Sequence, residues 1–193
     1  MTTADQDLDP RVERSRAAVL AAAYDLLIAD GPDAVVHGQV AAAARVSRTT
    51  VYKHFPTRGE LLRATIEVMG KPVPAELTGD LRTDLQRLLA DLVADLSDDQ
   101  RTRAIAAMIE RAQHDPTVAA VRDGIVCEAH EQFRTIVEQG ITSGALRDDI
   151  DADLAMSGLM GTFFFKRFMA GEQIDDDLAA RAVDAFVAAH SAR

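Results

Sequence analysis

The chain has 193 residues, of which 48% are hydrophobic, and a formal net charge of −10. This length and composition suffice for a packed core and exclude a disordered chain. One cysteine excludes an internal disulfide framework and fits a reducing cytoplasm, and no apolar run approaches the ~18 residues that span a membrane. We therefore expect a cytoplasmic protein that has no membrane partner.

Alanine-rich runs and scarce strand signals predict an all-α fold of about nine helices. Residues 1–10 are polar and acidic, so we expect a disordered arm there, followed by a first helix over 11–30. Three arginines crowd the start of this helix: Arg11, Arg14 and Arg16. They either touch phosphates beside a DNA site or form a solvated face, and the sequence leaves both readings open.

The stretch over 36–62 predicts two short helices joined by a tight turn, and the start of a third helix. Ser47 stands where an N-cap is needed, and Pro56 stops the second short helix. The outward positions of that second helix are rich in donors and contain no acid: Arg48, Thr49, Thr50, Tyr52, Lys53 and His54. Such groups can bond phosphates, and arginine can read guanine. A helix that merely faces water would not explain why this acid-rich chain places no carboxylate there.

The charge of the chain is unevenly distributed. Over 11–63 there are eight Lys and Arg against five Asp and Glu, whereas over 72–193 there are twelve against twenty-two. The acidic residues thus lie mostly outside the predicted DNA-binding stretch, where they keep the protein soluble and discourage the wrong face from approaching DNA.

The motif Val40-Ala-x-x-Ala-x-Val-Ser47, followed by Thr50-Val-Tyr52-x-His-Phe55, resembles the helix-turn-helix of TetR/AcrR-type transcriptional regulators. The resemblance implies a near-palindromic double-stranded DNA operator as partner. The DNA-binding residues predicted in this way are Ser47, Arg48, Thr49, Thr50, Tyr52, Lys53, His54, Arg58 and His37.

Two positions depart from the family pattern. Arg45 occupies the turn position where the family usually has glycine, and a left-handed conformation there costs an arginine about 1 kcal/mol. Val36 replaces the usual threonine cap of the first motif helix, so that His37 or solvent must serve the first N–H groups. Neither departure removes a predicted DNA contact.

Glycine and two prolines at 70–74 predict a boundary, because these residues do not continue a helix. We therefore expect a three-helix DNA-binding domain over 11–70 and a helical ligand-binding and dimerisation domain over 71–193. Hydrophobic periodicity predicts the further helices at 58–69, 81–96, 98–114, 116–140, 151–170 and 175–189.

The resemblance implies that the last two helices pair with their copies in a second subunit. A homodimer is also expected on physical grounds, because two helix-turn-helix units about 34 Å apart double the DNA readout. The residues predicted at this interface are Gly158, Gly161, Phe165, Phe168, Leu178, Ala182 and Phe186. Alternatively, the two glycines only accommodate packing within one subunit.

The resemblance also implies a pocket for a small, mainly apolar effector beside the long helix at 116–140. Its candidate residues are Ile105, Met108, Phe133, Met160, Phe163 and Phe164. Methionine and phenylalanine at helical spacing are also typical of an ordinary core. The alternative is a regulator that needs no ligand and whose second half only dimerises.

Cys127 and His130 lie three residues apart on a predicted helix, but no second cluster supplies further ligands, so we predict no metal and no cofactor. The sequence contains no Gly-rich phosphate loop and no nucleophile elbow, and we predict that the protein is not an enzyme. The expected function is a repressor that an effector releases from DNA. An all-α module that has lost DNA binding is the remaining alternative.

Overall fold

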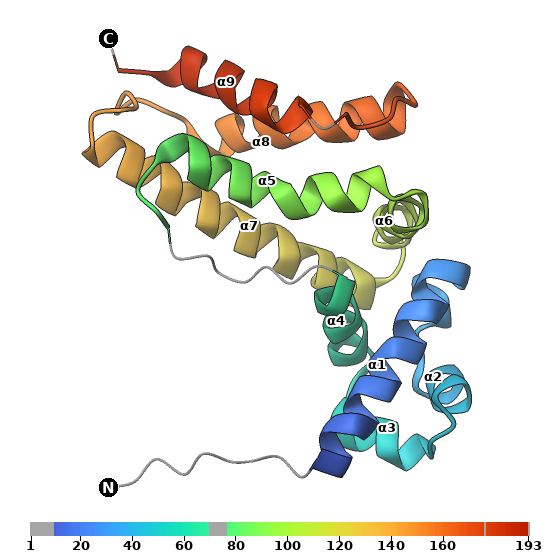
Figure 1. Ribbon diagram of the computed structural model, residues 1–193. Helices are drawn as coiled ribbons and strands as arrows, with labels where there is room; N and C mark the ends of the chain where they lie inside the picture. The colour runs from blue at the N-terminus through green and yellow to red at the C-terminus, as the bar shows by residue number, and fades with distance from the viewer. Residues whose placement is uncertain (1–9, 70–76, 176, 193) are drawn as a thin grey trace, which may run out of the picture. The chain divides into compact units, whose positions relative to one another are not determined.

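A computed structural model describes residues 10–69, 77–175 and 177–192, and within these ranges the chain forms nine α-helices (Figure 1). In the same ranges, β-type pairing is limited to one isolated antiparallel bridge between Leu146 and Ser191. The all-α prediction is therefore confirmed. The arm predicted over residues 1–10 lies outside the described residues except for Pro10, which begins α1, and so does the predicted boundary at 70–74.

The helices divide into two units by their contacts. Unit 1 contains the described residues up to Met69 together with Ala107–Val121. Unit 2 contains the described residues from Leu77 to Ala106 and those from Arg122 onward. The sequence predicted that everything after residue 70 belongs to the second domain. The structure instead groups the end of α6 and the start of α7 with unit 1, because those residues pack against it.

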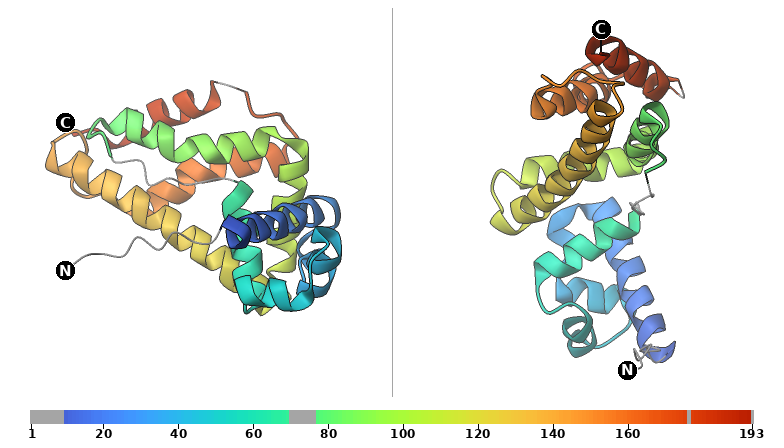
Figure 2. Two further views of the ribbon diagram at one scale, coloured as in Figure 1. Left: turned by 60° about the horizontal axis from the view of Figure 1, so that its bottom comes forward. Right: turned by 90° about the vertical axis from the view of Figure 1, so that its left-hand side faces the viewer.

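Unit 1 is built around its first helix. Its helices are α1 (Pro10–Asp30), α2 (His37–Ala44), α3 (Arg48–His54) and α4 (Arg58–Met69), with a short 3-10 turn at Pro32–Ala34. Helix α1 packs against α2, α3 and α4 (Figure 2). The buried residues that hold these helices together are Val19, Ala23 and Leu27 of α1, Val40 and Ala41 of α2, Val51 of α3, Phe55, and Leu61 and Leu62 of α4.

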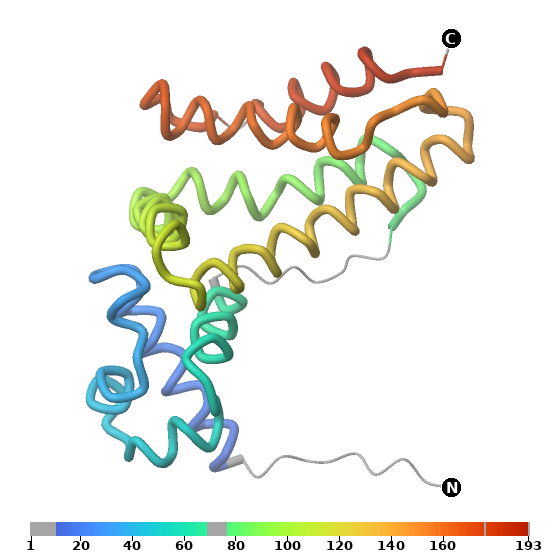
Figure 3. The backbone as a smooth tube through the Cα atoms, turned by 180° about the vertical axis from the view of Figure 1, so that it is seen from behind, coloured from blue at the N-terminus to red at the C-terminus, as the bar shows by residue number. Residues whose placement is uncertain are grey.

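Unit 2 has a core that four helices share. The helices that contribute to unit 2 are α5 (Leu81–Ser97), α6 (Asp99–Arg111), α7 (Pro116–Thr142), α8 (Ala152–Phe164) and α9 (Leu178–His190), and a π-helical turn at Phe165–Met169 follows α8. Helix α9 packs against both α5 and α8 (Figure 3). Buried side chains of α5, α7, α8 and α9 form one continuous hydrophobic cluster.

Aspartates fix where several of these helices begin. Asp80 accepts a hydrogen bond from the backbone N–H of Thr83 at 2.8 Å, and Asp151 accepts one from Leu154 at 3.0 Å. Asp115 accepts from the backbone N–H of Thr117 at the start of α7, also at 2.8 Å. These carboxylates satisfy N–H groups that have no partner within the helix. In the described ranges, no helix is both long enough and apolar enough to cross a bilayer.

Candidate DNA-binding surface

The turn between α2 and α3 is closed by backbone hydrogen bonds. The N–H of Val46 donates to Ala41 O at 3.0 Å, and the N–H of Arg45 donates to Ala42 O at 3.3 Å. Arg45 lies between these helices in the left-handed conformation, with φ 55° and ψ 40°. This is the usual C-terminal capping geometry of a helix, and it normally favours glycine. The left-handed conformation expected at Arg45 is confirmed.

Helix α3 begins at the predicted cap. Ser47 has an extended backbone, and its Oγ accepts a hydrogen bond from the N–H of Thr50 at 3.0 Å. The two hydroxyl groups of Ser47 and Thr50 also lie 2.8 Å apart. On the opposite side, Val51 and Phe55 are buried in the core of unit 1. The cap and these two anchors fix how far α3 extends and which side of it stays in solvent.

The exposed side of α3 carries Arg48, Thr49, Tyr52 and Lys53. Tyr52 keeps 52% of its surface exposed although it is aromatic. No Asp or Glu occurs between Asp33 and Glu60, so no carboxylate neutralises this stretch locally. Within the described ranges neither Arg48 nor Lys53 forms an ion pair. The side of α3 that faces solvent therefore carries hydrogen-bond donors and positive charge.

His54 was expected on the same outer face, but the structure places it half-buried against α1. Its Nε2 lies 3.0 Å from Ser15 Oγ. Burial lowers the pKa of His54 from 6.5, and the charges of Arg16 and Lys53 lower this pKa further. The Arg16 guanidinium itself lies 5.3 Å from the centroid of the Phe55 ring. His54 therefore joins α3 to α1, and its lowered pKa favours the uncharged imidazole.

His37 was predicted to contact DNA, and the structure gives it an internal role instead. It begins α2, is only 8% exposed, and its Nε2–H donates to Phe55 O at 2.7 Å. Its ring stacks on that of Tyr52, with centroids 3.9 Å apart and planes 9° apart. Val36, as expected, supplies no side-chain hydrogen bond at the start of α2.

Arg58 was predicted to contact phosphate, but its guanidinium is used within unit 1. Nη1 donates to Asp115 Oδ2 at 2.6 Å, Nη2 to Pro32 O at 2.9 Å and Nε to Val35 O at 3.3 Å. The bond from Arg58 is the main reason why the pKa of Asp115 lies below its ordinary value. A second cation, Arg111, reaches the same region, with its Nε 2.8 Å from Asp33 Oδ1.

The residues predicted to line an effector pocket do not share one environment. Phe133 and Phe163 are fully buried in the hydrophobic cluster of unit 2, and Ile105 and Met160 pack against that cluster. Met108 belongs to unit 1. Phe164 is partly buried, and its ring lies 5.7 Å from that of Phe168. Packing therefore accounts for the burial of Phe133 and Phe163 without a ligand.

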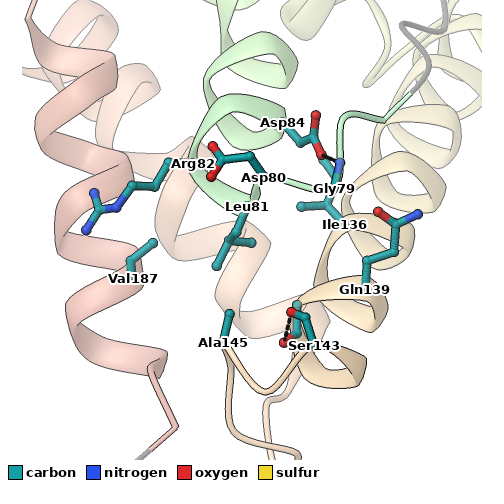
Figure 4. Close-up of a pocket in the computed structure, with 11 residues that line it drawn as sticks. Gly79, Asp80, Leu81, Arg82, Asp84, Ile136, Gln139, Ser143, Ala145 and Val187 are labelled. Atoms are coloured by element: carbon teal, nitrogen blue, oxygen red, sulfur yellow. Dashed lines mark hydrogen bonds between the residues drawn. The ribbon is translucent and has the colours of Figure 1, made fainter.

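Two hollows in unit 2 are lined by other residues. The first has a volume of about 260 Å³ and lies between the start of α5 and the end of α7, where Asp80, Arg82, Gln139 and Ser143 line it (Figure 4). The second is a groove of about 590 Å³ between α8 and α9. None of the six predicted effector residues lines either hollow. Of the six residues, Phe133 and Phe163 are buried in the core of unit 2, and an effector site at the others stays a prediction.

The predicted dimer residues separate into two groups. A Cβ added to Gly158 or Gly161 would meet no heavy atom within 4 Å, and Phe165 is 63% exposed. Leu178 and Phe186 are instead buried in the core, each 6% exposed. Ala182 and Phe168 are partly buried. Packing within the subunit therefore does not require the two glycines, whereas it does use Leu178 and Phe186.

Two exposed residues that the sequence analysis did not select extend this surface along α8 and the π-helical turn that follows it. Leu154 is 70% exposed and Met169 is 76% exposed. They follow the same helical spacing as Gly158, Gly161 and Phe165, so the spacing could have identified them. Together these five residues form what we call the α8 stripe.

The sequence also offered Cys127 and His130 of α7 as a possible metal pair. Within the described residues no group of three or more His, Cys, Asp or Glu side chains is placed to hold a metal ion. His130 Nδ1 lies 3.5 Å from Asp153 Oδ1, and Arg134 donates to the same oxygen at 2.8 Å.

The sequence of the chain matches models of a known protein family in both units. Residues 19–65 match the family described as bacterial regulatory proteins, tetR family, and residues 75–186 match the tetracyclin repressor-like C-terminal domain. The HTH-type transcriptional regulator YdeS of Bacillus subtilis is 28% identical over 169 residues, covering 86% of this chain and 85% of YdeS. The DNA-binding transcriptional repressor TetR of Mycobacteroides abscessus is 29% identical over 184 residues, covering 90% of this chain and 92% of that protein.

A solved structure agrees with the sequence matches. The TetR transcriptional regulator from Agrobacterium tumefaciens superposes with a TM-score of 0.69 at 27% identity, covering 96% of this chain and 97% of the other. Both family matches, the two relatives that cover 86% and 90% of this chain, and the helix-turn-helix of unit 1 lead to one assignment. The chain belongs to the TetR family of DNA-binding transcriptional regulators.

Proposed function

We propose that the protein is a cytoplasmic, homodimeric repressor. It places α3 of each subunit in the major groove of a near-palindromic DNA operator. The observation that carries this proposal is the exposed, carboxylate-free side of α3, which Ser47 and the buried Val51 hold in place. Arg48 can read a guanine, and Thr49 and Lys53 can bond bases or phosphates.

The structural findings refine which residues are proposed to touch DNA. Arg48, Thr49, Tyr52 and Lys53 are exposed and remain proposed contacts. Ser47 and Thr50 have hydroxyl groups that already bond each other, so they act first as the cap of α3. The remaining predicted residues, His37, His54 and Arg58, are proposed to support the DNA-binding surface from within unit 1.

The experiment for DNA binding starts with selection of bound duplexes from the source genome. The affinity of the selected duplex is then measured by fluorescence anisotropy for the wild type, Tyr52→Ala and Lys53→Ala. We expect each variant to bind about tenfold more weakly, as for loss of one hydrogen bond to a charged group. Lys166→Ala is a matched control, because Lys166 pairs with Glu172 in unit 2, and it should bind like the wild type. Unchanged affinity in both α3 variants would refute the assigned face.

We propose that the α8 stripe forms the dimer interface. Its exposed Leu154, Phe165 and Met169 support this assignment, since large apolar side chains that line up on one exposed helix face usually meet a partner. Gly158 and Gly161 allow a second helix to approach closely. Gly158→Leu has open space within the subunit, so it should leave the helical content unchanged while it abolishes the dimer in sedimentation analysis. A dimer that survives Gly158→Leu and Gly161→Leu together would place the interface elsewhere.

We further propose that unit 2 binds a small, mainly apolar effector, as the match of residues 75–186 to the repressor-like C-terminal domain supports. The effector must favour a dimer that binds DNA poorly, and DNA must weaken effector binding by the same factor. Burial of Phe133 and Phe163 favours the second candidate, a regulator that needs no ligand. A panel of small apolar compounds distinguishes the two. A compound that raises the thermal midpoint and releases the duplex supports the first, whereas no release by any compound supports the second.

A further inference from the structure

The contact between His37 and Tyr52 joins the start of α2 to the exposed side of α3. His37 is 8% exposed, whereas Tyr52 is 52% exposed. Their rings lie 3.9 Å apart and are parallel to within 9°. One ring is therefore held inside unit 1 while its stacking partner remains available to solvent.

The hydrogen bond of His37 fixes the plane of its ring. Nε2–H donates at 2.7 Å to the carbonyl oxygen of Phe55, which ends α3 and is itself 3% exposed. Because this oxygen lies beyond the last turn of α3, it has no partner within the helix. The bond also fixes the tautomer, since Nε2 must carry the proton to donate. The imidazole is thus anchored at one edge and presents one flat face to Tyr52.

We propose that His37 is a positioning residue for Tyr52 in DNA binding. The anchored imidazole restricts the ring of Tyr52 to one orientation, so the phenolic hydroxyl is directed toward a backbone phosphate before DNA arrives. An exposed tyrosine that is already ordered loses less side-chain entropy on binding. His37 contributes through Tyr52 and does not itself touch DNA. This inference rests on the proposed function, because it requires α3 to face the duplex.

The first test measures the stack without DNA. The chain has two tyrosines, Tyr24 and Tyr52, and no tryptophan, so 3-fluorotyrosine labelling gives two fluorine NMR signals. The nearby imidazole ring should shift the Tyr52 signal, which Tyr52→Phe assigns by its disappearance. His37→Ala should move this signal toward the free tyrosine position and leave that of Tyr24 unchanged. A Tyr52 signal that His37→Ala does not move would overturn the proposal.

The second test is a double-mutant cycle on the selected duplex. Tyr52→Phe removes only the hydroxyl, and we expect it to weaken binding about tenfold, as for loss of a hydrogen bond to a charged phosphate. His37→Ala should weaken binding by a similar factor. If His37 acts through that hydroxyl, the double variant binds no more than about twofold more weakly than Tyr52→Phe. Tyr24→Phe is the matched control, with affinity equal to the wild type.

The outcomes separate this inference from the proposed function. Losses that multiply to about a hundredfold in the double variant would mean that His37 acts independently of the Tyr52 hydroxyl, which overturns the inference alone. A wild type that binds no duplex overturns both proposals. If His37→Ala does not fold, His37→Phe is measured alone and not in the cycle, because its flat ring can still stack on Tyr52. We expect its affinity loss to be smaller than about threefold, since only the bond to Phe55 O is lost. A loss of about tenfold would contradict the role of stacking.

Discussion

Replacement of Arg58 by alanine should destabilise unit 1 rather than only weaken DNA binding. Arg58 donates to Asp115, Pro32 O and Val35 O, and its side chain is 24% exposed. Breaking a fully buried ion pair costs about 3–5 kcal/mol, and solvent screening reduces this value at a partly exposed site. Asp115 also keeps its bond from Thr117 N–H. We therefore expect Arg58→Ala to lower the free energy of unfolding by about 2–3 kcal/mol.

Urea unfolding followed by far-ultraviolet circular dichroism, without DNA and at one protein concentration, measures this effect. The control is Arg147→Ala, which removes an exposed pair whose side chains are 49% and 73% accessible, and it should cost less than about 1 kcal/mol. An Arg58→Ala protein as stable as this control would refute the internal role of Arg58. If the same variant also bound DNA more weakly, Arg58 would be the phosphate contact that its sequence position suggested.

Three further changes follow from the geometry of the helix-turn-helix. Arg45→Gly relieves a left-handed φ of 55° and should raise the free energy of unfolding by about 1 kcal/mol in urea titrations. Ser47→Ala removes the cap of α3 and should lower it by about 1 kcal/mol in the same assay. Because the pKa of His54 is below 6.5 in the folded protein, protons bind the unfolded chain better, so stability should be lost as pH falls through 6.5. In His54→Gln, the midpoint of thermal unfolding should change less between about pH 7 and pH 5 than it does in the wild type. If the midpoint depends on pH as steeply as in the wild type, His54 is not the cause.

The elements that could be predicted from the sequence are those with local signals. The start of α3 follows from Ser47, whose cap bond reaches only to Thr50, and its end follows from Pro56, two residues after His54. The start of α7 follows in the same way from the aspartate that precedes Pro116. Each signal acts within one helical turn, so no knowledge of the tertiary structure is needed.

The supporting residues of the site could not be predicted because their partners are distant in sequence. His37 bonds the carbonyl of Phe55, 18 residues away, and Arg58 bonds Asp115, 57 residues away. Both residue types commonly contact phosphate, and only the fold shows that these two are used internally. Periodicity also could not distinguish a pocket from a core at Phe133 and Phe163, since both require the same buried apolar positions.

The central claim is that α3 enters the major groove of an operator in two copies. Thr49 is exposed on α3 and the one cysteine is Cys127, so Thr49→Cys combined with Cys127→Ser gives a single attachment point for an iron chelate. On the selected duplex, the tethered chelate should cut two clusters of positions related by two-fold symmetry and about one helical turn apart. Cleavage that is spread evenly along the duplex would contradict the account. So would cleavage that does not exceed that of the free chelate although the labelled protein is bound to the duplex.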